Sequence, residues 1–185
     1  MNILLLFISL LPIRTLYSEI DKKGLDVILS YPIPRWKYLL EKYAGFLTYA
    51  LLYPISIITV VITSSVFLNE DINVTLVINY SIGIYLIIFA LGSISLLVLT
   101  IFLDSNKSMA VAGVVVVGMY LLESLGGMIQ VLDNIQFLSI FHYFKINTLL
   151  ETNSLPILDV VVVALTGLIA LACSLLIFDR REFAN

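Results

Sequence analysis

The stretch LVINYSIGIYLIIFALGSISLLVLTIFL, residues 76–103, decides the fold of this chain. It contains no charged side chain, and about 20 apolar residues of helix are enough to cross the hydrocarbon core of a bilayer. A strand of a membrane β-barrel would alternate apolar and polar residues, whereas this stretch is continuously apolar. Residues 76–103 therefore predict a transmembrane helix.

The rest of the chain has the same character. Of its 185 residues, 61% are hydrophobic and only 12% are charged, which is more apolar surface than a soluble domain of this size can bury. The composition predicts an all-α polytopic membrane protein. The one cysteine, Cys173, excludes an intrachain disulfide. No basic region precedes the first apolar run, so we expect no cleaved signal peptide.

Working outward from residues 76–103, we expect five transmembrane helices in a single transmembrane domain, residues 1–185. The expected helices are 1–17, 43–68, 76–103, 109–129 and 157–178. Between and after them we expect an amphipathic cytoplasmic segment at 18–42, an outer re-entrant or interfacial segment at 130–156, and a cytoplasmic tail at 179–185. Pro54 lies inside the second helix, where proline removes a backbone hydrogen bond and favours a kink.

The positions of lysine and arginine predict the orientation in the cell membrane, because cytoplasmic loops carry an excess of both. If the segment 18–42 is cytoplasmic, nine of the ten lysines and arginines lie on or near the inner side, and only Lys145 lies outside. The C-terminus is then cytoplasmic and the N-terminus is outside. The outer side collects acidic residues instead: Glu70, Asp71, Asp133 and Glu151.

The charged segment EIDKKGLDVILSYPIPRWKYLLEK, residues 19–42, interrupts the apolar runs. Leu25, Ile28 and Leu29 have the spacing of one helix face, so they predict a short amphipathic helix near the membrane surface. Pro32 ends that helix, and Arg35 opens a second one. Two interpretations remain open. The segment is either a surface connector anchored by aromatic and basic residues, or a docking element for a cytoplasmic partner.

The same segment resembles the region between the second and third helices of ABC-2 type permeases, the membrane subunits of type-2 ABC exporters. The family pattern is roughly E…GTLE-x-LLS-x-P-[IV]-S-R, followed by a basic aliphatic run into the next helix. The residues in matching order are Glu19, Leu25, Asp26, Ile28, Leu29, Ser30, Pro32, Ile33 and Arg35. The sequence departs from the pattern at Lys23-Gly24, which replaces Gly-Thr, and at Pro34, which replaces the serine.

The resemblance implies a function and a set of partners. It implies a permease that exports a substrate with ATP hydrolysed by separate cytoplasmic ATPase subunits, and a second permease copy in a homodimer or heterodimer. The segment from Glu19 to Arg35 would be the coupling segment that docks on the ATPase. The five expected helices match helices two to six of the family, so we expect a chain that lacks the first helix. The pattern is similar to the single-domain branch that includes the copper-site maturation (NosY-like) permeases.

Glu123 is the other candidate site residue, because carboxylates inside the membrane often act in translocation or gating. Gly126 and Gly127 follow it, so the helix could instead end there and expose Glu123 to water or to the outer segment. His142 has no other ligand nearby, and its aromatic neighbours favour an interfacial position over a metal site. Thr166, Ala170 and Ser174 have the spacing of a helix-packing stripe.

The sequence contains no phosphate-binding loop, no Ser/His/Asp set, no metal-ligand motif and no basic groove for nucleic acid. We therefore expect no catalytic, cofactor-binding or metal-binding residue, and membrane lipid as the surrounding medium. Two alternatives to a transporter stay open. One is a structural assembly or immunity subunit without transport, and the other, less favoured, is a membrane-embedded enzyme.

Overall fold

The computed structural model describes residues 8, 10–13, 34–69, 71–102, 104–126, 135–144 and 146–180, without the side chains of Arg35 and Ser105. Over these residues it is helical and contains no strand. Four of the described helical segments are long and apolar enough to cross a membrane: Trp36–Leu68, Val74–Phe102, Asn106–Gly126 and Ile157–Arg180. The predicted all-α polytopic fold is confirmed. The further helix expected at residues 1–17 lies largely outside the described residues.

The first described span consists of α3 (Arg35–Ala50) and α4 (Leu52–Leu68), which follow one another with a break at Leu51. Proline has no backbone N–H, so Pro54 cannot donate to the carbonyl of Ala50, and the helical ladder is interrupted there. α3 begins at Arg35, where the sequence predicts that a helix opens after Pro34. It continues into the apolar run from Tyr43 and buries an apolar face.

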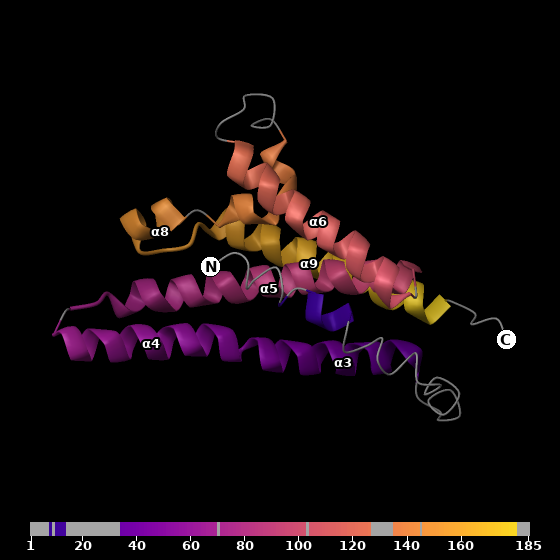
Figure 1. The fold of residues 1–185 in the computed structure, drawn as a ribbon, viewed down its shortest axis with the longest axis horizontal. Coiled ribbons are helices and arrows are strands. Elements are labelled where there is room, and N and C mark those ends of the chain that lie inside the picture. The colour runs from indigo at the N-terminus through magenta and orange to yellow at the C-terminus, as the bar shows by residue number, and fades with distance from the viewer. Residues whose placement is uncertain are drawn as a thin grey trace.

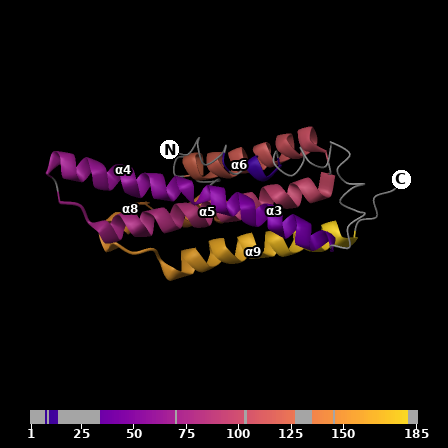
Figure 2. The same cartoon turned by 90° about the horizontal axis from the view of Figure 1, so that it is seen from below.

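That apolar face of α3 packs on the centre of the bundle. Its buried residues recur at helical spacing: Leu39, Tyr43, Phe46 and Ala50. The central helix is α5 (Val74–Phe102), which contacts α3, α4, α6 (Ser105–Gly126) and α9 (Ile157–Arg180). Figure 1 shows α5 running between α3–α4 on one side and α6 with α9 on the other, and in Figure 2 α6 and α9 lie on opposite flanks of α5.

The contact between α3 and α5 includes a buried hydroxyl pair. The Tyr43 hydroxyl lies 2.7 Å from the carbonyl oxygen of Phe89, to which it donates, and 2.7 Å from Ser93 Oγ. Ser93 Oγ donates in turn to the Phe89 carbonyl. Gly92 lets the two helices approach, because a Cβ there would lie 2.7 Å from Phe46 Cε1. Membrane helices associate through such close packing and interhelical hydrogen bonds rather than through the hydrophobic effect.

The α5–α9 contact is the most extensive in the described part of the chain. The α9 residues buried on this face are Val163, Gly167, Ala170, Ser174 and Phe178. Ala170 and Ser174 were predicted to lie on a packing stripe, but Thr166 does not extend it. Thr166 is half-buried and its hydroxyl donates to the Val162 carbonyl of the same helix, whereas Gly167 takes the buried position.

The two ends of the bundle differ in composition. The start of α3, the end of α5, the start of α6 and the end of α9 lie together at one end (Figure 1). Lys37, Lys107 and Arg180 are on these helix ends. Three short elements lie away from that end: η2 (Gln136–Leu138) and η3 (Ile140–Tyr143) pack on α6, η3 also packs on the middle of α5, and α8 (Ile146–Thr152) lies nearer the start of α5.

The exposed surface of α4 is largely apolar, and its exposed serine and threonine hydroxyls donate to backbone carbonyls of the same helix. Leu52, Val66, Phe67 and Leu68 are all more than half exposed. An apolar helix surface of this kind suits contact with lipid tails, and it would be costly in water.

Candidate functional site

The predicted docking segment falls almost entirely outside the described residues. The predicted site residues there are Glu19, Leu25, Asp26, Ile28, Leu29, Ser30 and Pro32. Of the predicted set at this end, only the backbone of Arg35 is described, and it opens α3. The helix that continues from the segment is described, and its apolar face is packed on α5.

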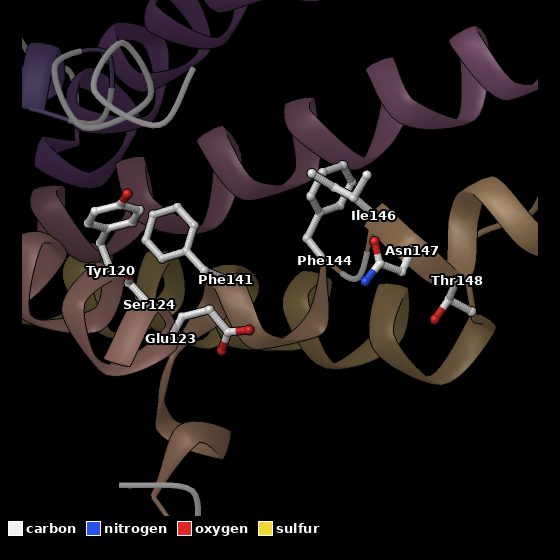
Figure 3. A pocket seen from close by; sticks show the side chains of 8 residues that line it. All are labelled: Tyr120, Glu123, Ser124, Phe141, Phe144, Ile146, Asn147 and Thr148. Carbon is white, nitrogen blue, oxygen red and sulfur yellow. The ribbon is translucent and has the colours of Figure 1, made fainter. Parts of the chain in front are cut away.

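A cavity of about 500 Å³ opens at the opposite end of the bundle. Its described lining comes from the end of α6, from η3 and the residue after it, and from the start of α8 (Figure 3). The lining residues are Tyr120, Glu123, Ser124, Phe141, Phe144, Ile146, Asn147 and Thr148. We call this cavity the outer pocket, after its predicted side of the membrane.

Ser139 attaches η3, which lines the outer pocket, to α6. Its side chain is fully buried, and its hydroxyl donates to the carbonyl of Met119 at 2.8 Å. The same oxygen accepts the backbone N–H of Phe141 at 3.2 Å, which caps η3. The Phe141 ring then meets Tyr120 of α6 edge to face, with ring centroids 5.9 Å apart. Ser139 thus sets the position of Phe141, whose ring lines the pocket.

Phe144 and Asn153 attach the other side of the pocket to α5. The Phe144 ring lies over Gly83, where any Cβ would overlap it, and 5.6 Å from the ring of Tyr80. After α8, Asn153 has a positive φ of 54°, and its side-chain oxygen accepts from Asn73 Nδ2 at 2.9 Å. Its carbonyl oxygen accepts from Asn79 Nδ2. The segment between η3 and α9 is therefore held to the first turns of α5.

Glu123 is the charged residue of the described lining. Its side chain is 33% exposed, and its Oε2 lies 3.2 Å from Nδ1 of His142, whose side chain is 27% exposed. Among the described residues, no hydrogen bond to the second oxygen, Oε1, is found. In Figure 3 the carboxylate points along the pocket, toward the side that Asn147 and Thr148 line. Glu123 thus meets the outer segment through one oxygen while it faces the cavity.

The outer pocket combines one carboxylate with hydroxyl, amide and aromatic groups. Such a set can bind a ligand through charge, hydrogen bonds and ring contacts. Within the described residues, no three or more His, Cys, Asp or Glu side chains are placed to hold a metal ion. The pocket therefore offers binding groups and no metal centre built from the described part of the chain.

Sequence reasoning identified Glu123 but not its partner His142, which is nineteen positions away. It also missed Ser139, Phe141 and Phe144. The signal that could have found them is the run FLSIFHYF, residues 137–144, in which aromatic residues flank a serine and a histidine. Their packing on α6 and α5 depends on a tertiary contact that no local pattern encodes.

A protein-family model described as an ABC-2 family transporter protein matches residues 1–178. Comparison with curated proteins and with solved structures gave no match.

Proposed function

The chain belongs to the ABC-2 transporter family and is a multi-pass transmembrane permease, and from this premise we propose that it exports a substrate with ATP hydrolysed by separate cytoplasmic ATPase subunits. In this proposal the chain has no catalytic activity of its own, and it works with a second permease copy in a dimer. We assign it to the single-domain, NosY-like branch. The observation that carries the proposal is the family match, which includes the whole segment from Glu19 to Arg35.

We assign ATPase docking to that segment, because its apolar face at Leu25, Ile28 and Leu29 would fit a groove on a soluble partner. The described structure supports a path from it into the bundle. Pro34 precedes α3 directly, and α3 is anchored on α5 by Tyr43 and by the Gly92 contact. A rigid helix that begins at the docking segment can carry a displacement into the central helix.

The two ends of the bundle then have different roles. The end with Lys37, Lys107 and Arg180 is assigned to the cytoplasm, as is the C-terminus, because cytoplasmic loops are enriched in lysine and arginine. The end with the outer pocket faces the outside of the plasma membrane. Glu123 lies at that end and is assigned to the outer gate, where the substrate leaves. ATP binding would favour one of two packings of the bundle.

Co-purification tests this proposal. The tagged permease is isolated in mild detergent from its native cells as wild type, Leu25→Asp, Leu29→Asp and Lys22→Ala, and the ATPase subunit that accompanies it is quantified. Apolar anchors in a groove dominate such contacts, at roughly 2 kcal/mol or more each, so either aspartate variant should lose at least about 30-fold in ATPase affinity. Lys22→Ala is the matched control on the charged face, where a substitution should matter much less.

Membrane levels of each variant are measured in parallel, because the docking residues should not be needed for insertion. Retention of the ATPase by both leucine variants at the wild-type level would contradict the docking assignment and leave the segment as a surface connector. A wild-type permease that carries no ATPase would favour the alternative of a membrane assembly subunit without transport.

A further inference from the structure

We infer that the outer pocket binds the ammonium group of an organic cation, and that the exported substrate carries a positively charged amine. This inference rests on the proposed function, because it gives the chemical class of the substrate at the gate. It starts from the described lining, which combines one carboxylate with three aromatic rings in a cavity of about 500 Å³.

Charge is the first argument. Glu123 contributes the one charged side chain of the described lining, and its negative charge favours cations over anions at this site. Nδ1 of His142 lies 3.2 Å from Oε2 of this carboxylate, so one of its two oxygens has a partner within the chain. Among the described residues Oε1 accepts no hydrogen bond, which leaves an acceptor for an N–H donor of the ligand.

The aromatic walls are the second argument. Tyr120, Phe141 and Phe144 line the same cavity as the carboxylate (Figure 3). Faces of aromatic rings attract ammonium groups, and this attraction is stronger where water is partly excluded. Phe141 and Phe144 are fixed by the contacts with Tyr120 and with Gly83, so these walls are formed before a ligand arrives.

The polar residues at the far side are the third argument. Asn147 and Thr148 of α8 line the pocket on the side toward which the Glu123 carboxylate points. An amide and a hydroxyl can accept further N–H groups or bind polar parts of the same ligand. The arrangement suits a molecule with an apolar body against the rings and a cationic amine at Glu123.

The test is equilibrium binding to the full chain, purified in nonionic detergent without ATP and without the ATPase. The probes are benzylammonium, neutral benzyl alcohol and anionic phenylacetate, each corrected for binding to empty micelles. Wild type should bind the ammonium probe at least about tenfold more tightly than the other two, since one charge–charge contact at a partly exposed site contributes about that factor.

Three variants separate a ligand contact from a structural role. Glu123→Gln keeps the shape and removes the charge, and should weaken binding of the ammonium probe about tenfold. Glu151→Gln is the matched control, because Glu151 is exposed and outside the described lining, and this variant should bind as wild type does. His142→Asn removes the partner of Glu123 but keeps the carboxylate, and should bind within about twofold of wild type or more tightly.

Equal affinity for the three probes, or unchanged binding in Glu123→Gln, would overturn the inference. So would equal losses in Glu123→Gln and His142→Asn, because these would show that the pair only holds the outer segment in place. Glu123→Gln should also retain the ATPase in co-purification. A wild-type chain that shows no preference for the ammonium probe but still carries the ATPase would therefore reject the ligand class and leave the proposed function standing.

Discussion

Substitution of Gly167 by alanine tests the packing of α9 on the central helix. A Cβ at this position would lie 2.5 Å and 2.8 Å from Cε1 and Cδ1 of Phe89, and 3.1 Å from the Cα of Ala90. Carbon atoms in good contact are about 3.5–4.0 Å apart, so the Phe89 ring and the α9 backbone must move by about 0.5–1 Å. The ring can rotate, but the Ala90 Cα cannot, so the two helices must separate.

The size of the effect depends on two opposing contributions. Overpacking a well-packed contact typically costs about 1–3 kcal/mol. Replacing glycine by alanine within a helix returns at most about 1 kcal/mol. We therefore expect Gly167→Ala to lower the free energy of unfolding by about 1–2 kcal/mol. Gly45 on α3 is the matched control, because a Cβ there meets nothing within 4 Å. Gly45→Ala should leave the stability unchanged or raise it slightly.

The assay is unfolding of the purified chain in mixed micelles of mild detergent and dodecyl sulfate, followed by far-ultraviolet circular dichroism. The difference between the two variants cancels the contribution of helix propensity and isolates the α5–α9 contact. If Gly167→Ala is as stable as Gly45→Ala, α9 does not pack on Phe89 and Ala90 as described, and the central position of α5 is wrong.

Substitutions at Tyr43 and Asn153 test two further features of the contacts with α5: a buried hydrogen bond and a backbone conformation. Tyr43→Phe removes the hydroxyl that bonds to the Phe89 carbonyl and Ser93, and should destabilise the chain by about 1 kcal/mol in the same unfolding assay. The control Tyr49→Phe changes a residue that is 76% exposed and should have no effect. Asn153→Ala should lower the thermal midpoint more than Asn153→Gly, since both lose the bond to Asn73 but only alanine is strained at a φ of 54°; equal midpoints would mean that this backbone conformation is not held.

The helical membrane fold could be predicted from the sequence, because continuous apolar runs such as residues 76–103 determine both the helix and its length. The helix that Arg35 opens could also be predicted, and α3 begins there. How far a membrane-spanning part extends into the amphipathic stretch with Trp36 and Lys37 was less predictable. Hydropathy alone finds the apolar part of a span, and its ends depend on which face can pack on a neighbour.

The candidate site was only partly predictable. Glu123 could be singled out, since a carboxylate near the end of an apolar run is unusual. Its contact with His142 could not, because it depends on how Ser139 ties η3 to α6. The buried position of Gly167 could not be predicted either, because the sequence analysis placed Thr166 on the packing stripe of α9 instead. Both have the spacing of a packing stripe, and only the position of Phe89 on α5 decides between them.

The orientation of the docking segment is the central claim, and site-directed cysteine labelling measures it most directly. In a Cys173→Ser background, Lys22→Cys and Ser154→Cys are treated in intact cells with a membrane-impermeant maleimide, and again after permeabilisation. Ser154 is exposed at the end with the outer pocket, next to the hydrogen-bonded Asn153. The account predicts labelling at position 154 in intact cells, and at position 22 only after permeabilisation. Labelling at position 22 but not at 154 in intact cells would place the docking segment away from ATP and contradict the account.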